Sequence, residues 1–209
     1  YWGFQTIMER LGTRRPPLVI IENVPGLLTT HNGEDMLAIV SGLASLGYSL
    51  DILQLDALHF VPQSRARLFI IGVASSRVER RPDPLDAISL RPQRANRFMS
   101  LHPQIPWTRV WADQPLPQPK TNLRTFLEEL PPDADAWWDS RSVQRLVDRM
   151  SPRHRALLGL HVRSSQLSYA TVYRRVRPTG YMAEARFDGI AGCLRTPRGG
   201  GFRSAPKRP

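Results

Sequence analysis

Cysteine is almost absent from this sequence: Cys193 is the only one in 209 residues. A single cysteine excludes a disulfide within the chain and a metal site built from several cysteines, and we expect no bound metal. It also fits a reducing compartment. The sequence lacks an apolar run of ~18 residues that would span a membrane, and it lacks the basic segment and apolar core of a signal peptide. We therefore expect a cytoplasmic protein without a membrane partner.

Lysine is also scarce, since 27 of the 29 basic residues are arginines. The net charge of +11 is unevenly distributed: residues 1–75 carry five arginines and six acids, whereas residues 141–209 carry fifteen basic residues and three acids. Arginine forms forked hydrogen bonds with phosphates and guanine edges, so this distribution favours nucleic-acid binding by the last third of the chain. A merely soluble basic surface, enriched in arginine by GC-rich coding, is the alternative.

Glycine is missing between Gly72 and Gly159, and ten prolines fall between residues 75 and 135. We expect irregular, loop-rich chain there.

The segment before residue 75 has a different pattern. It predicts a short helix over 4–12, a buried strand over 18–24, a helix over 34–46 and strands over 49–55 and 68–74. This order is typical of an α/β, Rossmann-like (doubly wound) sheet. Three strands are too few for such a sheet, so the segment corresponds to the second half of one.

The basic last third shows weaker signals. Apolar spacing predicts a helix over 140–150, and Ser151-Pro152 begins another that continues to about residue 160. Residues 180–201 are rich in glycine and arginine, and we expect a loop with a short strand over 189–194. Arg141, Arg145 and Arg149 recur four residues apart, which suits either phosphate contact or a solvated helical face.

Two polar motifs adjoin the apolar strands. Glu22-Asn23-Val24 ends the strand over 18–24, and Gln63-Ser64-Arg65-Ala66-Arg67 precedes the strand over 68–74. Open α/β sheets bind ligands at the carboxyl ends of their strands. One carboxylate and two guanidinium groups at this edge would suit a polar, planar group such as a nucleobase.

In these motifs, and in their separation by about 40 residues, the chain resembles the DNA (cytosine-5)-methyltransferases over residues 9–75. A weaker resemblance covers residues 190–200, which are similar to the segment that closes the family's target-recognition region. The resemblance implies three parts: residues 1–75 as the second half of the catalytic domain, 76–177 as the target-recognition region, and 178–209 as its end and the return toward the catalytic domain.

In this family a cysteine thiolate adds to C6 of a cytosine flipped out of double-stranded DNA, and C5 then attacks the methyl group of S-adenosyl-L-methionine. Negative charge develops on the ring and must be met at N3 and O2. The resemblance implies that Glu22 contacts N3 and the exocyclic amine, that Arg67 donates to O2, and that Arg65 holds the pocket or the DNA backbone. It also assigns substrate-binding roles to Asn23, Gln63 and Arg195.

Each assignment has an alternative. Glu22 could cap a loop, and Arg65 and Arg67 could be a solvated pair in a turn. Asn23 could orient the turn through hydrogen bonds from its side chain to the backbone.

The sequence departs from the family pattern in what it lacks. It has neither a Phe-x-Gly-x-Gly cofactor loop nor a Pro-Cys-Gln nucleophile motif, and Cys193 follows Gly192 instead of proline. The late motif that closes the cofactor pocket is absent too. We therefore expect a fragment that is inactive alone, with exposed sheet edges that a complementary N-terminal half or subunit would cover.

The setting we expect is prokaryotic, either restriction-modification or phage defence, with the protein associated with the nucleoid. The alternative function is a non-catalytic DNA-binding module, or a decayed pseudoenzyme that retains only the recognition region.

Overall fold

The computed structural model describes residues 1–77, 90–108, 110, 116–177 and 180–193. The chain divides into two compact units. The first, here called the sheet unit, comprises Tyr1–Asp56 and Ala66–Leu116. The second, here called the hairpin unit, comprises Ala57–Arg65 and Pro117–Pro209. Within the described ranges, no helix is both long and apolar enough to cross a membrane.

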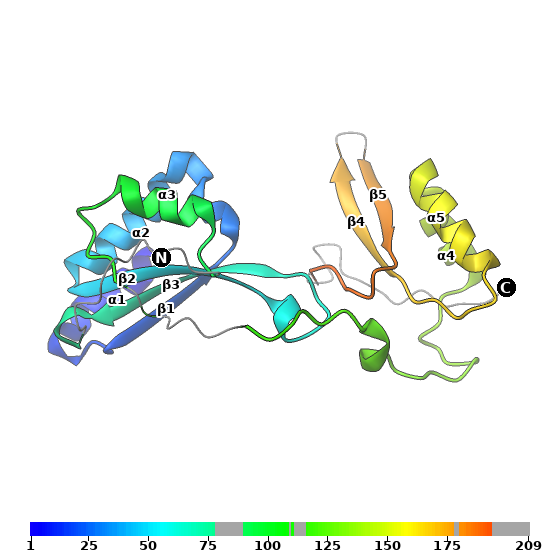
Figure 1. The fold of residues 1–209 in the computed structure, drawn as a ribbon, viewed down its shortest axis with the longest axis horizontal. Helices are drawn as coiled ribbons and strands as arrows, with labels where there is room; N and C mark the ends of the chain where they lie inside the picture. The colour runs from blue at the N-terminus through cyan, green and yellow to red at the C-terminus, as the bar shows by residue number, and fades with distance from the viewer. Residues whose placement is uncertain (78–89, 109, 111–115, 178–179, 194–209) are drawn as a thin grey trace. The chain divides into compact units, whose positions relative to one another are not determined.

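The sheet unit contains a three-stranded sheet in the order β1-β3-β2 (Figure 1). Its strands are β1 (Leu18–Asn23), β2 (Tyr48–Asp56) and β3 (Ala66–Ala74). Strand β3 is antiparallel to both neighbours, so β1 and β2 run in the same direction on either side of it. The unit is therefore a mixed α/β structure, as predicted from the apolar pattern. The finer assignment to a Rossmann-like fold stays a prediction.

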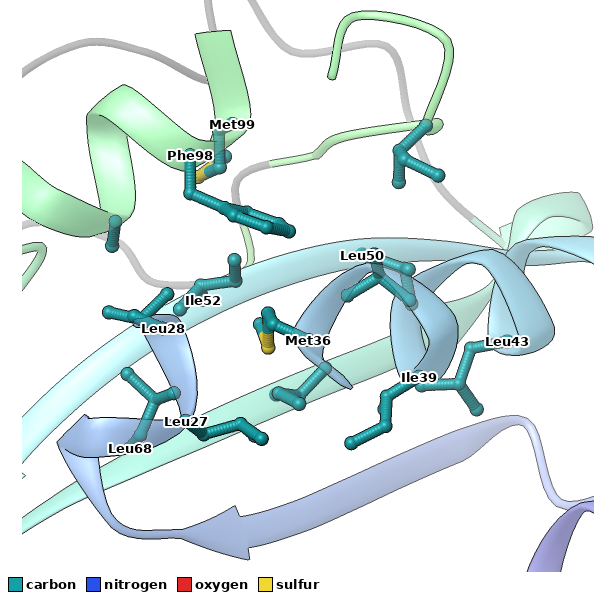
Figure 2. Packing of buried hydrophobic residues seen from close by; sticks show 14 of the residues in the cluster. Leu27, Leu28, Met36, Ile39, Leu43, Leu50, Ile52, Leu68, Phe98 and Met99 are labelled. Carbon is teal, nitrogen blue, oxygen red and sulfur yellow. The ribbon is translucent and has the colours of Figure 1, made fainter. Parts of the chain in front are cut away.

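One face of this sheet carries the main hydrophobic core. Leu50, Ile52, Leu68 and Ile70 are fully buried on it, because alternate residues of a strand point to the same face. Figure 2 shows side chains of α2 (Glu34–Ser45) and α3 (Gln93–Leu101) packed over these strands. Helix α1 (Trp2–Leu11) joins the same core through Met8.

The opposite face is covered unevenly. Near β2, Leu53 packs against Leu90, and the fully buried Asp51 accepts a 2.5 Å hydrogen bond from Arg91. Near β1, in contrast, Leu18 and Ile20 are 49% and 58% exposed. Among the described residues, β1 pairs only with β3, so its outer edge carries no partner strand. The expectation of an exposed sheet edge and apolar surface is confirmed for this part of the chain.

The hairpin unit contains two helices, α4 (Ser140–Asp148) and α5 (Pro152–Arg163), and an antiparallel pair, β4 (Thr171–Arg177) and β5 (Gly180–Arg186). Its small core centres on Met150, Ala183 and Ala185. Both helices begin at side-chain caps: Ser142 N–H donates to Asp139, and His154 N–H donates to Ser151.

Short 3₁₀ turns connect the larger elements: η1 (Gly12–Arg14), η2 (Pro25–Leu28), η3 (Thr30–Gly33), η4 (Ala57–His59), η5 (Ser75–Arg77) and η6 (Leu123–Phe126).

The structure confirms, within a few residues, the three predicted strands of the sheet and four predicted helices: those over 4–12, 34–46 and 140–150 and the one after Ser151.

Two predictions were wrong. The loop-rich segment contains α3, whose buried Phe98 and Met99 lie on one side of an otherwise polar helix. The segment after residue 180 begins with β5, whose inward side chains Ala183 and Ala185 give only a weak apolar alternation. In place of a strand over 189–194, the described part forms a single bridge at Ala191.

The two compact units have different boundaries from the three functional parts predicted from the sequence. The turn over 57–65 lies between β2 and β3 yet belongs to the hairpin unit. It is bonded there through its backbone: Lys120 N–H donates to Leu58 O at 2.6 Å, and Ala191 N–H donates to Pro62 O at 2.7 Å. The functional limits 1–75, 76–177 and 178–209 stay a prediction.

Candidate active site

Glu22 and Arg67 lie together at one end of the sheet. Glu22 is the penultimate residue of β1 and stands opposite Phe69 of β3. Arg67 precedes Phe69 by two residues, so its side chain is on the same face as that of Glu22. Because the strands are antiparallel, the end of β1 meets the beginning of β3, and Arg67 Nε lies 2.6 Å from Glu22 Oε1.

The two side chains differ in exposure. The Arg67 side chain is 18% exposed and its Nη1 donates to Ala66 O at 2.8 Å, whereas the Glu22 side chain is 51% exposed. The guanidinium is therefore held in place while the carboxylate remains open to an incoming group. A carboxylate and a guanidinium side by side offer both acceptors and donors to a planar molecule.

The side chain of Asn23 stabilises the turn that follows β1. Val24 N–H donates to Asn23 Oδ1 at 2.8 Å, and Leu27 N–H donates to Val24 O at 3.1 Å at the start of η2. This is the local hydrogen bonding expected of a turn-forming asparagine. Contact of Asn23 with a substrate stays a prediction.

Gln63 and Arg65 belong to the hairpin unit. Ser64 N–H donates to Ala191 O at 2.8 Å, Gln63 Nε2 donates to Gly192 O at 3.4 Å, and Arg65 Nη1 donates to Cys193 Sγ at 3.0 Å. The Gln-Ser-Arg-Ala-Arg motif is thus divided: its first two polar positions lie in one unit and Arg67 lies in the other. Arg195 is outside the described residues.

Two side-chain contacts were not predicted from the sequence. The buried pair of Asp51 and Arg91 joins residues 40 apart, and a single acid in the alternating pattern of β2 was its only signal. In the hairpin unit, the guanidinium carbons of Arg149 and Arg174 lie 4.0 Å and 5.0 Å from the ring centroid of Tyr181. Neither contact has a local sequence pattern, because each depends on tertiary pairing.

Within the described ranges, no group of three or more His, Cys, Asp or Glu side chains is arranged to hold a metal ion.

The sequence model of the C-5 cytosine-specific DNA methylase family matches residues 4–175. The match includes β1, the turn over 57–65 and β3. It therefore includes Glu22, Asn23, Gln63, Arg65 and Arg67. The chain belongs to the C-5 cytosine-specific DNA methylases.

Several bacterial and phage proteins are similar to parts of the chain. Type II methyltransferase M.AgeI of Thalassovita gelatinovora is 33% identical over 118 residues, which cover 56% of this chain and 26% of that protein. Type II methyltransferase M.BanI of Aneurinibacillus aneurinilyticus is 40% identical over 75 residues, 35% of this chain and 18% of that protein. Orphan methyltransferase M.SPBetaI of Bacillus phage SPbeta is 39% identical over 67 residues, 32% and 15% respectively. The chain thus spans about a quarter or less of the length of these relatives.

Proposed function

We propose that the chain is part of a DNA (cytosine-5)-methyltransferase and supplies its base-binding edge and its DNA-recognition unit. The substrate is a cytosine flipped out of double-stranded DNA, and the product is methylated at C5. The observation that carries this proposal is the 2.6 Å contact between Arg67 and Glu22, which brings one acceptor and one donor group to a single strand edge.

In this proposal, Glu22 binds the N3 and amine edge of the base, and Arg67 donates to O2. Cytosine presents an amine donor and two acceptors, N3 and O2. Glu22 can accept from the amine and, when it carries a proton, donate to N3, while Arg67 donates to O2. As negative charge develops on the ring, the fixed guanidinium stabilises it, because a preorganised donor needs no rearrangement. Gln63, Arg65, Asn23 and Arg195 would support the base or the DNA around it.

S-adenosyl-L-methionine would supply the methyl group. The residues of this chain offer no counterpart of its binding loop, since the sequence has no Phe-x-Gly-x-Gly segment, and it has no Pro-Cys-Gln nucleophile. We do not assign that role to Cys193, because it follows Gly192 instead of proline. Its sulfur accepts a hydrogen bond from Arg65 within the hairpin unit. We therefore assign the methyl-donor site and the nucleophile to a complementary N-terminal half, carried on the same polypeptide or on a partner.

The outer edge of β1, which has no partner strand among the residues that the structure describes, is the surface we assign to that half. Leu18 and Ile20 present exposed apolar side chains beside it, and an unpaired strand edge readily accepts another strand. The resulting larger sheet would be Rossmann-like. We further propose a prokaryotic restriction-modification setting in the cytoplasm, with the protein bound to the nucleoid; the type II methyltransferases among the relatives support the restriction-modification part.

The test is reconstitution. This chain is combined with an N-terminal half that contains both missing motifs, and transfer of tritiated methyl groups to duplex DNA is measured. We expect transfer with the wild-type chain and its loss in Glu22→Gln. Glu34→Gln, which makes the same change on an exposed residue of α2, is the matched control and should remain active. Absence of transfer by the wild-type pair would leave the alternative of a non-catalytic DNA-binding module or pseudoenzyme. Equal activity of both variants would remove the catalytic role of Glu22.

A further inference from the structure

The β4–β5 hairpin presents two chemically different faces. On one face, Glu184 Oε2 accepts from Tyr173 Oη at 2.8 Å and from Arg175 Nε at 3.1 Å. Glu184 is the only acid in the sequence of the two strands, so the charge of Arg175 is compensated there. The opposite face carries Arg174 and Tyr181, and within the described residues it has no acid of its own.

Arg149 joins that second face from the end of α4. Its carbonyl accepts from Ala183 N–H at 3.0 Å, and Met150 forms a bridge with Ala183, so the backbone at this point is bound to β5. The Arg149 guanidinium then lies over Tyr181, at 4.0 Å from the ring centroid. Arg174 of β4 stands opposite Ala183 of β5, and its guanidinium carbon lies 5.0 Å from the centroid of the same ring.

Two guanidinium groups are therefore held against one ring, and none of the ion pairs among the described residues involves either of them. Since both lie against one ring, their central carbons are at most 9.0 Å apart, the sum of 4.0 and 5.0 Å. Both residues are exposed, and neither forms an ion pair with any residue that the structure describes. Both guanidinium groups can interact with the same polyanion, and each such contact to a phosphate is a charge-assisted hydrogen bond.

The surroundings favour an extended polyanion over a small one. Val176, 81% exposed, stands opposite Tyr181, and Arg145 and Arg141 continue the exposed basic row along α4. Ala183 and Ala185, on the same face, are buried in the core of the hairpin unit, so the accessible part of this face lies around Val176 and Tyr181. The end of a two-stranded ribbon can enter the major groove of DNA, where arginines contact phosphates and guanine edges and an apolar side chain can meet a thymine methyl group. Cation–π contact with Tyr181 restricts both arginines beforehand and lowers the entropy lost on binding.

We propose that Arg149, Tyr181 and Arg174 form a preorganised DNA contact of the hairpin unit, in which the uncharged ring holds two guanidinium groups against the phosphate backbone. This inference rests on the proposed function, because it assigns the DNA contact of that same enzyme. It makes Tyr181 a positioning residue and the two arginines the binding groups.

The test measures binding of the 209-residue chain to a fluorescent 30-base-pair duplex by anisotropy over a range of salt concentrations. Arg149→Gln and Arg174→Gln should each weaken binding about tenfold and reduce the log–log salt slope by about one. Tyr181→Leu should weaken binding about three- to tenfold with little change in slope, because no charge is lost. Tyr181→Phe, which keeps the ring, should bind as the wild type does.

Arg14→Gln is the charge-matched control, since it removes an exposed arginine from the sheet unit. Circular dichroism of every variant establishes that the fold is retained, and a Tyr181→Leu chain that has lost its fold is replaced by Tyr181→Met. The proposal is overturned if the two Gln variants behave like Arg14→Gln, or if a folded chain without the ring binds like wild type. If the wild-type chain itself fails to bind duplex DNA, the DNA-binding part of the proposed function fails together with this inference.

Discussion

Arg67 Nε is 2.6 Å from Glu22 Oε1. The antiparallel register of β1 and β3 brings these two side chains together at one end of the sheet. A base that binds both groups must approach them while they are paired with each other. The half-exposed side chain of Glu22 leaves it accessible for that approach.

The pair should matter far more for catalysis than for stability. In the reconstituted enzyme, we expect Glu22→Gln and Arg67→Ala each to lower methyl transfer by about 100-fold or more, because they remove groups that meet developing charge. The same changes should alter the free energy of unfolding by less than about 1 kcal/mol, since a partly exposed ion pair contributes little. Transfer kinetics and urea unfolding of the two single variants and the double variant give both quantities. A large loss of stability with unchanged transfer would make the pair structural.

The buried pair of Asp51 and Arg91 should show the opposite pattern. Asp51→Ala removes a carboxylate that accepts from Arg91, Ile52 N–H and Val110 N–H, and it leaves a cation in a site that is 0% exposed. We expect a loss of about 3–5 kcal/mol in the free energy of unfolding, measured in urea. The control is Asp35→Ala, which breaks the exposed pair with His31 and should cost less than about 1 kcal/mol.

Gly33 should resist substitution because of its backbone. The chain is left-handed at His31, Asn32 and Gly33, with φ values of 46°, 56° and 89°. A Cβ at Gly33 would meet only ordinary contacts, at 3.5 Å from Leu28 O and 3.6 Å from the Phe98 ring, so the cost lies in the conformation. We expect Gly33→Ala to destabilise the chain by about 1–2 kcal/mol. Gly3→Ala, within α1 and with open space around it, should instead stabilise it by about 0.5–1 kcal/mol. Thermal unfolding compares the two.

Local patterns were sufficient to predict the three strands of the sheet unit and its helices α1 and α2, but not α3. The continuous apolar runs of β1 and β3 and the helical spacing of α2 are local signals, and the acid at the end of β1 marked the site. What the sequence could not reveal was pairing. The position of β3 between β1 and β2, the division of Gln63 and Arg65 from Arg67, and the contact of Arg149 with Tyr181 all depend on long-range contacts. The hairpin was missed because its core is made of alanines and its surface of arginines.

Acid should weaken the start of α4. Hydrogen bonds from the Ser142 N–H and then the Ser142 hydroxyl hold the pKa of Asp139 below its ordinary value of 3.8. A carboxyl group whose pKa is lowered on folding stabilises the fold above 3.8, and this contribution is lost as the pH falls through the folded-state value. We expect Asp139→Ala to lower the melting temperature at pH 6 and to have a smaller effect near pH 2. The control Asp133→Ala, at an exposed position six residues earlier, should show no such dependence.

The apolar surface beside β1 should be required for assembly. Ile20→Thr keeps a β-branched side chain on a strand where the wild-type residue is 58% exposed, so the chain should fold and become more soluble. Complementation by the N-terminal half should fall sharply in the methyl-transfer assay. Leu160→Thr, which replaces a leucine that is 62% exposed on α5, should complement normally. Equal complementation by both variants would assign the joining surface elsewhere.

The position of the turn over 57–65 in the hairpin unit limits how chimeras of related chains can be built. Its backbone is bonded to Lys120 and Ala191, although it is encoded between two strands of the other unit. A chimera that transplants only the contiguous stretch from residue 117 onward would inherit this turn from the recipient and lose its matched hydrogen bonds. Grafts that carry both pieces from one donor should fold, and recombination in nature would be constrained to preserve the same pair.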